Sequence, residues 1–466
     1  MPLILLFVAG CEKYHARPLT PSVILMDVER ARHLAAENET ASSEPFTFSR
    51  AVELARVHSP ALKQTRAEYE TALALAKVRT PFPNPAVEVG PQYGFGPDVA
   101  STNRLQPFGS IGFTIPTGRR LKRQDELNQM QAELSRVELL VRGRELYLEL
   151  RESYIRLAVS KQRITARQEI AESAEKSTTA TKRLVEAGQG TGLDVGLIRL
   201  EQARLRTDAL AAETTFAQVL GELSSLIGVH SKHFETIPES SLPPMKDSLP
   251  PLSELQTLLL NNHPELARVR AQYEVAERQL HLEIAKQYPD FHIGPSFQRD
   301  VGEKKNVLGL TLGIELPVFE RNQQAVATAK QRREEIRVKY ETAANRALAA
   351  LDRAHRQYHL ALERLKLLQT VVAPITREDI ELARKSFEAG ATDLLRLLET
   401  ERGQRAVQLD ALESELSVRA AWLDLEKATG LPLLLFPSET HELTPPALPG
   451  SAESTHEKPS EKEPSK

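Results

Sequence analysis

Residues 307–317, which read VLGLTLGIELP, alternate strictly between two kinds of side chain. A strand points successive side chains to opposite faces, so a period of two predicts a strand whose faces differ. One face carries the large apolar positions Leu308, Leu310, Leu312, Ile314 and Leu316. The other face carries the small or polar positions Gly309, Thr311, Gly313 and Glu315.

Most of the remaining chain has the composition and spacing of long helices. Very long helices are predicted over 118–187 and 322–388, and Pro374 should kink the second. At 1.5 Å per residue, about 70 helical residues span roughly 105 Å. The first helix has a seam with coiled-coil spacing, interrupted by Arg144 and Arg151. The apolar seam positions are Leu127, Met130, Leu134, Val137, Val141, Leu148, Ile155 and Ala158.

An internal repeat organises the chain. Gly90-Pro91 recurs 204 residues later as Gly294-Pro295, and Pro116 recurs 201 residues later as Pro317. Each half is predicted to contain a helix, two strands, a long helix, a glycine-containing turn and a return helix. The first half places them at 48–79, 86–95, 109–116, 118–187 and 192–227, and the second at 253–287, 290–298, 307–317, 322–388 and 394–429.

The repeat sets the predicted domain boundaries. In order, they are a signal and lipobox segment at 1–11, an N-terminal extension at 12–45, the first repeat at 46–236, a Pro- and Ser-rich linker at 237–251, the second repeat at 252–436 and a disordered tail at 437–466.

The single cysteine, Cys11, follows a short apolar run. Residues 8–11 resemble the lipobox of bacterial lipoproteins, which implies lipidation at Cys11. Glu12 follows the cysteine, and by the same resemblance it favours the outer membrane. No basic residue precedes the apolar run, which departs from the usual signal peptide.

The 466 residues are 41% hydrophobic and 26% charged, with a net charge of −3. The chain has no excess of basic residues, so its charge does not favour nucleic acid as a partner. The sequence contains no run of 18 or more apolar residues, so no transmembrane helix is predicted. Strands of about ten residues can cross a bilayer, but membrane barrels need about eight strands or more. The four strands of one chain therefore predict a barrel shared by several chains. Its apolar face would meet lipid, and Gly309, Thr311, Gly313 and Glu315 would face the lumen.

The chain resembles the TolC-like outer-membrane efflux proteins, in particular their heavy-metal (CzcC-like) branch. The resemblance rests on the lipobox, the doubled order of elements, PNPAVEVG (83–90) and the EAG…LDV turn (186–195). It implies a mostly α fold in which three chains share a transmembrane β-barrel above a long α-helical barrel. It also implies a homotrimer in the outer membrane, docked on a periplasmic adaptor (membrane fusion) protein and an inner-membrane RND pump.

By the same resemblance, the helical tips would form the gate and the adaptor-docking surface. The residues concerned are Gly188, Gly190, Gly192 and Asp194 at the first tip, and Gly390, Asp393 and Arg396 at the second. The two aspartates either cap the helices that follow or form an acidic ring around the aperture. Arg199, Arg396 and Arg402 are candidates for gating ion pairs.

The expected function is passive export of metal cations or small toxic compounds, without enzymatic activity or a cofactor. His355 and His359 lie one helical turn apart, which fits either packing or contact with a metal ion. Two alternatives remain open at this stage. One is the channel of a type I protein secretion system, and the other is a lipid-anchored coiled-coil scaffold.

Overall fold

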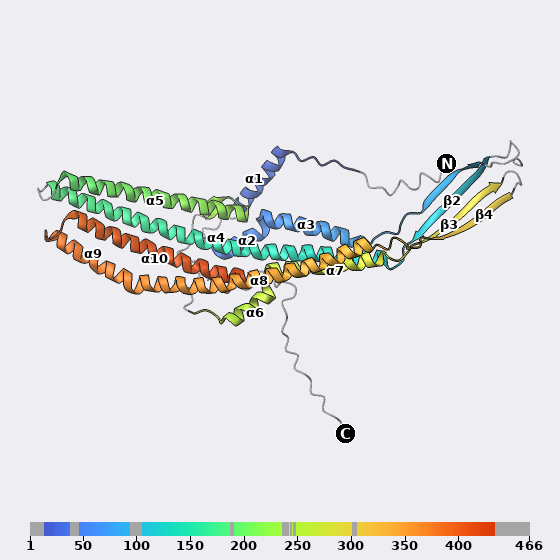
Figure 1. Ribbon diagram of the computed structural model, residues 1–466. Helices are drawn as coiled ribbons and strands as arrows, with labels where there is room; N and C mark the ends of the chain where they lie inside the picture. The colour runs from blue at the N-terminus through green and yellow to red at the C-terminus, as the bar shows by residue number, and fades with distance from the viewer. Residues whose placement is uncertain are drawn as a thin grey trace, which may run out of the picture.

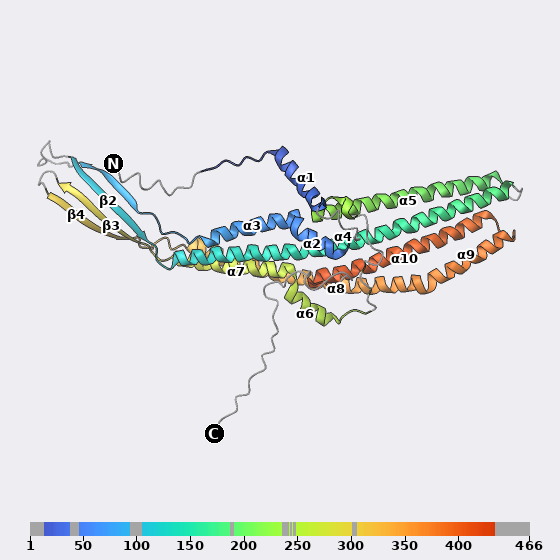
Figure 2. The same cartoon turned by 180° about the vertical axis from the view of Figure 1, so that it is seen from behind.

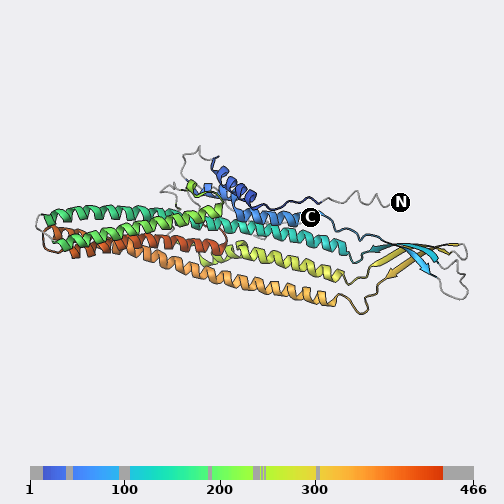
Figure 3. The same ribbon diagram turned by 90° about the horizontal axis from the view of Figure 1, so that it is seen from above.

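The computed structural model describes residues 14–37, 46–93, 105–186, 191–234, 242, 245, 248–300 and 305–433. A four-stranded sheet forms one end of an elongated molecule, and two helical hairpins extend to the other end (Figures 1 and 2). Seen from above, the two hairpins lie side by side (Figure 3). Cys11, Gly188, Gly190 and the predicted tail at 437–466 fall outside the described residues.

The two repeats have the same order of elements. After α1 (Pro21–Glu37), the first repeat comprises α2 (Phe48–His58), α3 (Pro60–Lys77), β1 (Ala86–Tyr93), β2 (Leu105–Ile115), α4 (Arg120–Glu186), α5 (Gly192–Ile227) and the 3-10 turn η2 (Ser231–Phe234). The second comprises α6 (Leu252–Asn262), α7 (Pro264–Ala285), β3 (Phe291–Asp300), β4 (Lys305–Ile314), α8 (Gln323–Leu367), η3 (Leu368–Val372), α9 (Ala373–Glu388) and α10 (Leu394–Thr429). The return helices α5 and α10 have the predicted bounds.

The helix predicted to open each repeat is instead two helices. Pro60 and Pro264 each begin a new helix, and the preceding Ser59 and His263 have non-helical ψ angles of 123° and 124°. A proline disfavours the helical conformation of the residue before it, while its own fixed φ suits the first position of a helix. The prediction of one continuous helix over 48–79 and over 253–287 was therefore wrong.

Glycines at equivalent positions end the two return helices with the same tight contact. Gly228 has φ +82° and Gly430 has φ +76°, so both adopt the left-handed conformation that favours glycine. A Cβ on Gly228 would lie 2.7 Å from the carbonyl oxygen of His58, and one on Gly430 would lie 2.5 Å from that of Asn262. The repeat in the sequence is thus a repeat of backbone packing.

The second long helix is interrupted near Pro374, as predicted. Residues 368–372 form a π-helical turn, and Pro374 follows at the start of α9. The offset between the repeats grows from 201 at Pro317 to 202 at Gly390. A π turn holds one more residue than an α turn, so η3 accommodates the extra residue of the second repeat.

The sheet has the order β1-β2-β3-β4, and every neighbouring pair is antiparallel. Its strands differ slightly from prediction: β2 begins at Leu105, β3 reaches Asp300, and β4 runs from Lys305 to Ile314. Glu315, predicted to lie within the strand, comes one residue after its end. Among the described residues, no helix is long and apolar enough to cross a membrane.

Two arginines of α4 hold the repeats together instead of interrupting the seam. Arg144 and Arg151 are both almost completely buried. Arg151 donates from Nε and Nη2 to the two carboxylate oxygens of Glu426 on α10, at 3.0 and 3.1 Å. The same carboxylate accepts from Trp422 Nε1 (3.1 Å) and from the backbone N–H of Leu433 (2.8 Å). Because its oxygens are hydrogen-bonded, this buried charge has the partners it requires.

Arg144 binds the ends of two helices of the other repeat. Its Nη1 donates to the carbonyl oxygens of Gly430 (2.9 Å) and Asn262 (3.2 Å), which end α10 and α6. Burial lowers the pKa of Arg144 to about 10, so the side chain stays cationic at neutral pH. A cation at two helix C-termini is favoured by both helix dipoles.

Replacing Glu426 by Gln tests this junction. The amide would leave Arg151 buried without a counter-charge, so we expect a loss of about 3–5 kcal/mol in the free energy of unfolding. The measurement is the urea midpoint followed by circular dichroism of the helices. As the matched control, Glu222→Gln removes the exposed ion pair with Arg156 (3.0 Å) and should cost about 1 kcal/mol or less. Equal losses in the two variants would contradict the assignment.

Candidate functional site

One face of the sheet is apolar across all four strands. The pairings Val87–Ile111, Phe113–Ile293 and Ile293–Leu312 place strand partners on the same side. This apolar sheet face consists of Val87, Val89, Tyr93, Leu105, Ile111, Phe113, Ile115, Phe291, Ile293, Pro295, Phe297, Leu308, Leu310, Leu312 and Ile314. Many of these side chains are exposed, including Leu308, Leu310 and Leu312. So large an exposed apolar surface marks an interaction with a membrane or another protein.

The opposite face of the sheet is mostly small or polar, with Phe108 and Val307 as its apolar members. Gly309, Thr311 and Gly313 pair with Ser296, Gly294 and His292 on this side. Hydrogen bonds between strands order it further: Gln298 Nε2 donates to Gln106 Oε1 (2.8 Å), and Thr114 Oγ1 lies 3.1 Å from His292 Nδ1. A Cβ on Gly309 would lie 2.6 Å from Ser296 Oγ, so glycine makes room for that hydroxyl. Gly309, Thr311 and Gly313 therefore share this mostly small and polar surface, and Glu315 lies beyond the end of the strand.

At the other end of the molecule, the two hairpin tips pack on each other. Ile198 at the start of α5 is buried with Leu394 and Leu398 at the start of α10. Leu197 and Phe387 pack around this tip cluster. Side chains from both repeats thus form one small core, which ties the two tips together within one chain.

Both predicted tip aspartates take part in capping a helix. Asp194 forms a capping box with Thr191, whose backbone N–H and hydroxyl both donate to the carboxylate at 2.8 Å. These hydrogen bonds hold the pKa of Asp194 below its usual value. Asp393 is the N-cap of α10 and accepts from the backbone N–H of Arg396 at 3.0 Å. Of the two interpretations left open by the sequence, the geometry supports capping.

The glycines at the tips have different roles. Gly390 has φ +69° and open space around its Cα, so its backbone conformation, not crowding, favours glycine. Gly192 is the first residue of α5 and is helical, with nothing near a Cβ. Gly192 therefore lies in the first turn of α5, where nothing in the backbone demands glycine.

A buried carboxylate that the sequence analysis missed joins the hairpins just above the tips. Glu201 on α5 accepts from Arg402 Nη2 and Arg405 Nη2 on α10, both at 2.7 Å. Burial alone raises the pKa of Glu201, but Arg402, Arg405 and Arg204 outweigh it and hold the pKa below its usual value. The sequence analysis named Arg402 as a candidate for a gating ion pair but did not name its partner, Glu201. Helical spacing could have found that partner, because Glu201 follows Ile198 by three residues and so lies on the same inward face of α5.

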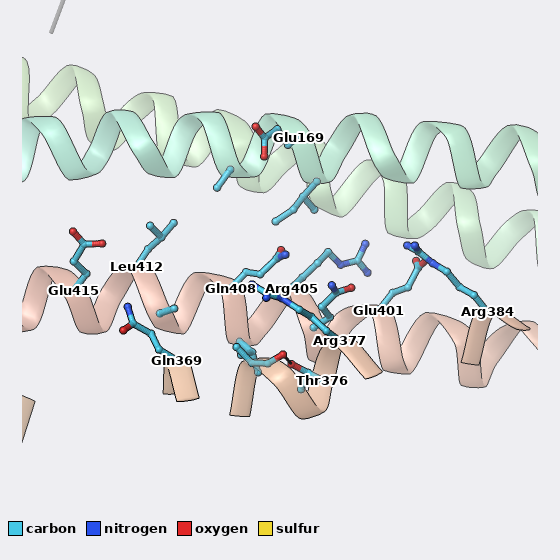
Figure 4. Close-up of a pocket in the computed structure, with 16 residues that line it drawn as sticks. Glu169, Gln369, Thr376, Arg377, Arg384, Glu401, Arg405, Gln408, Leu412 and Glu415 are labelled. Atoms are coloured by element: carbon cyan, nitrogen blue, oxygen red, sulfur yellow. Dashed lines mark hydrogen bonds and ion pairs between the residues drawn. The ribbon is translucent and has the colours of Figure 1, made fainter. Parts of the chain in front are cut away.

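Beside this Glu201 clamp, a groove of about 640 Å³ separates α4 from the second hairpin (Figure 4). Glu169 of α4 lines one side of it, and Arg377 and Arg384 of α9 and Arg405 of α10 line the other. Arg384 Nη2 donates to Glu401 at 3.5 Å. The groove mixes both signs of charge with glutamines, so it forms a polar surface between the hairpins, next to the π turn.

The two histidines predicted as a pair do lie together on α8. The rings of His355 and His359 have centroids 5.1 Å apart in an edge-to-face arrangement. Burial and the neighbouring His359 lower the pKa of His355. In the part of the chain that the structure describes, no group of three or more His, Cys, Asp or Glu residues could hold a metal ion.

Comparison with known proteins identifies the architecture. A protein-family model described as "Outer membrane efflux protein" matches residues 255–431. The chain is 27% identical over 248 residues to the cobalt-zinc-cadmium resistance protein CzcC of Cupriavidus metallidurans, covering 52% of this chain and 58% of that protein. It is 25% identical over 275 residues to the pyoverdine export outer membrane protein OpmQ of Pseudomonas aeruginosa, covering 53% of this chain and 54% of that protein.

These matches span little more than half the length of either relative. The fold extends further, because the crystal structure of CusC superposes with a TM-score of 0.67 at 16% identity, covering 83% of this chain and 92% of that one. The family match, the doubled hairpins and the four-stranded sheet agree with one another. Residues 255–431 thus match the family of outer membrane efflux proteins, and the chain shares the fold of the CusC structure over 83% of its length.

Proposed function

We propose that three copies of this chain form a passive conduit across the outer membrane for a tripartite efflux system. The observation that carries this proposal is the sheet, whose apolar face has no cover within the described chain while its other face is mostly small or polar. In lipid, backbone groups at an open sheet edge have no water to bind, so a membrane-spanning sheet must close on itself. Three copies with four strands each supply twelve strands, above the minimum of about eight.

In this arrangement the apolar sheet face meets lipid, and Gly309, Thr311 and Gly313 line the lumen. Small side chains there keep the lumen wide. The helical hairpins extend into the periplasm over the length of α4, whose 67 residues correspond to about 100 Å. Cys11 carries a lipid that anchors the chain beside the barrel, and the repeats at 46–236 and 252–436 act as its two structural halves.

The proposed cargo is metal cations or small toxic compounds. The names of the two relatives support this range, since one concerns resistance to cobalt, zinc and cadmium and the other concerns export of pyoverdine. The conduit docks on a periplasmic adaptor (membrane fusion) protein and receives cargo from an inner-membrane RND pump, which supplies the energy.

The tips form the gate and the docking surface in this proposal. The proposed set is Gly188, Gly190, Gly192 and Asp194 in the first repeat and Gly390, Asp393 and Arg396 in the second. The Glu201 clamp supports the gate, because it couples α5 to α10 and makes the two hairpins of one chain move together.

Cysteine labelling tests the two faces of the sheet. In isolated outer membranes, Thr311→Cys should react with a water-soluble maleimide, since its side chain faces the water-filled lumen. Leu310→Cys, its immediate neighbour, should stay unlabelled because lipid covers it. The parent chain reports any background from Cys11. Labelling at equal rates, or at Leu310→Cys alone, would contradict the proposed orientation.

Hydrogen exchange tests the clamp. In Glu201→Gln, Arg402 and Arg405 lose their charged acceptor, and a charged hydrogen bond contributes about 1.5–3 kcal/mol. Amides of 394–405 should therefore exchange about tenfold faster or more. The control is Glu213→Gln, an exposed carboxylate on the same helix.

The lowered pKa of Glu201 means that the wild-type clamp persists at neutral pH and weakens as the pH falls below the ordinary glutamate range. If the exchange rates were unchanged in Glu201→Gln, the proposed role of the Glu201 clamp in the gate would be contradicted.

Growth and accumulation assays test the cargo. Cells that lack this chain but keep its pump and adaptor should accumulate the cargo. Their growth should be inhibited at lower concentrations of the cargo than in the parent cells, and restoring the chain should reverse both effects. Zn²⁺, Co²⁺ and Cd²⁺ are compared with a fluorescent organic dye. A response to metals alone or to the dye alone identifies the cargo class. No response to any of them would refute small-compound export.

A further inference from the structure

Two histidines on α8 form a pair that the proposed conduit does not use. His355 and His359 are one helical turn apart, and their ring centroids lie 5.1 Å from each other. Residues at this spacing are neighbours on one face of a helix. The turn that carries them is anchored, because Ala354 and Tyr358 are buried in a cluster with side chains of α6 and α10. The helix therefore fixes the spacing of the two imidazoles.

Neither imidazole is committed to another group of the protein. His359 is exposed and His355 is half-buried. Among the described residues, the two rings contact each other and neither has a hydrogen-bond partner. Burial and the neighbouring His359 lower the pKa of His355, so this ring is neutral at neutral pH. A neutral imidazole keeps a lone pair on one ring nitrogen, and this is the form that binds a metal ion.

Acidic residues extend this face of α8 in both directions. Asp352 precedes His355 by three residues. Glu363 follows His359 by four, so the two carboxylates and the two imidazoles share one face of the helix. Both carboxylates attract a cation placed at the imidazoles.

The arginines of this stretch are directed elsewhere. Arg356 Nε donates to a backbone carbonyl oxygen of the preceding turn at 3.3 Å. Arg364 Nη2 pairs with Asp410 of α10 at 3.3 Å. Arg353 is two residues from His355 and therefore lies on a different face of the helix. The imidazole pair is thus the part of this face that offers uncharged nitrogen ligands.

The chemistry of the pair selects the class of cation. Imidazole nitrogen suits Zn²⁺, Co²⁺, Ni²⁺ and Cu²⁺, whereas Mg²⁺ and Ca²⁺ prefer oxygen ligands. Two histidines four residues apart on a helix supply two zinc ligands in the H-E-x-x-H motif. In the described chain, no third His, Cys, Asp or Glu joins the pair in a group that could hold a metal ion. The protein therefore supplies two ligands here.

We propose that His355 and His359 chelate one divalent transition-metal ion on the surface of α8, with water as the remaining ligands. Such a site is open and exchanges its ion, unlike a structural site with four protein ligands. Helices α8 and α9 run from Gln323 to Glu388, so the ion is held about midway between the sheet and the tip. The site goes beyond the proposed function and does not depend on it, because one chain supplies both ligands.

Calorimetry with Zn²⁺ tests the site in the detergent-extracted full chain, prepared without a histidine tag. Wild type should bind one more Zn²⁺ per chain than His355→Gln/His359→Gln. Its Kd for this ion should be about tenfold lower or more than in either single variant, because an ion held by one imidazole is already positioned for the other. Titration with Mg²⁺ should show no difference between the wild type and the double variant.

A matched control keeps the number of histidines and changes only their spacing. Gln357→His combined with His359→Ala places the second imidazole about 200° around the helix from His355. This control should bind Zn²⁺ as the double variant does. Electron paramagnetic resonance of bound Cu²⁺ should detect two coordinated imidazoles at the site in the wild type and not in the control.

Two results would overturn the proposal. Equal Zn²⁺ affinity in the wild type and in the matched control would show that the histidines bind ions singly. If Asp352→Asn/Glu363→Gln lost the Zn²⁺ ion while His355→Gln/His359→Gln kept it, the ligands would be the carboxylates and not the imidazoles.

Discussion

A buried carboxylate, Glu426, fixes how the two repeats sit against each other. It receives two hydrogen bonds from Arg151, one from Trp422 and one from the backbone of Leu433. Rings of Phe48 and Tyr147 lie 5.7 Å from the guanidinium carbon of Arg151 and exclude water from the pair. Because charges buried in this way tolerate little change in geometry, α4 and α10 meet in one register. That register sets where the sheet lies at one end and where the tips meet at the other.

The same junction explains why a repeated sequence does not give a symmetric molecule. Arg144 and Arg151 on α4 correspond to Asn345 and Asp352 on α8. Only the first repeat therefore has the cations that bind the helix ends and the carboxylate of the second. Within one chain the repeats are joined by the buried arginines Arg144 and Arg151 of α4. At the equivalent positions of α8, the second repeat has the smaller polar residues Asn345 and Asp352. This asymmetry places the buried ion pair between the repeats at one junction only, between α4 and α10.

The tips show the same asymmetry in a second place. Glu201 binds Arg402 and Arg405, but the repeat-equivalent positions are Gly403, Leu200 and Ala203. A charged clamp thus belongs to the contact within one chain alone. The aspartates of the tips are engaged in capping, so the chemistry that holds the hairpins together resides in the helices behind the turns. Behind the tips, the two hairpins of one chain are therefore joined by the ion pairs of Glu201.

The sequence by itself determined the repeat, the elements and the two faces of the strands. Strict alternation from Leu308 to Ile314 fixes the faces, because a strand has no other way to place successive side chains. The bounds of α5 and α10 were equally legible, since Gly228 and Gly430 end them in a conformation that favours glycine. Tertiary structure alone decided what Arg144, Arg151 and Glu201 do. In the sequence, a charged residue on a helical seam looks like an interruption of the seam. Its partner lies hundreds of residues away and comes within hydrogen-bond distance only in the folded chain, so no local pattern predicts the contact.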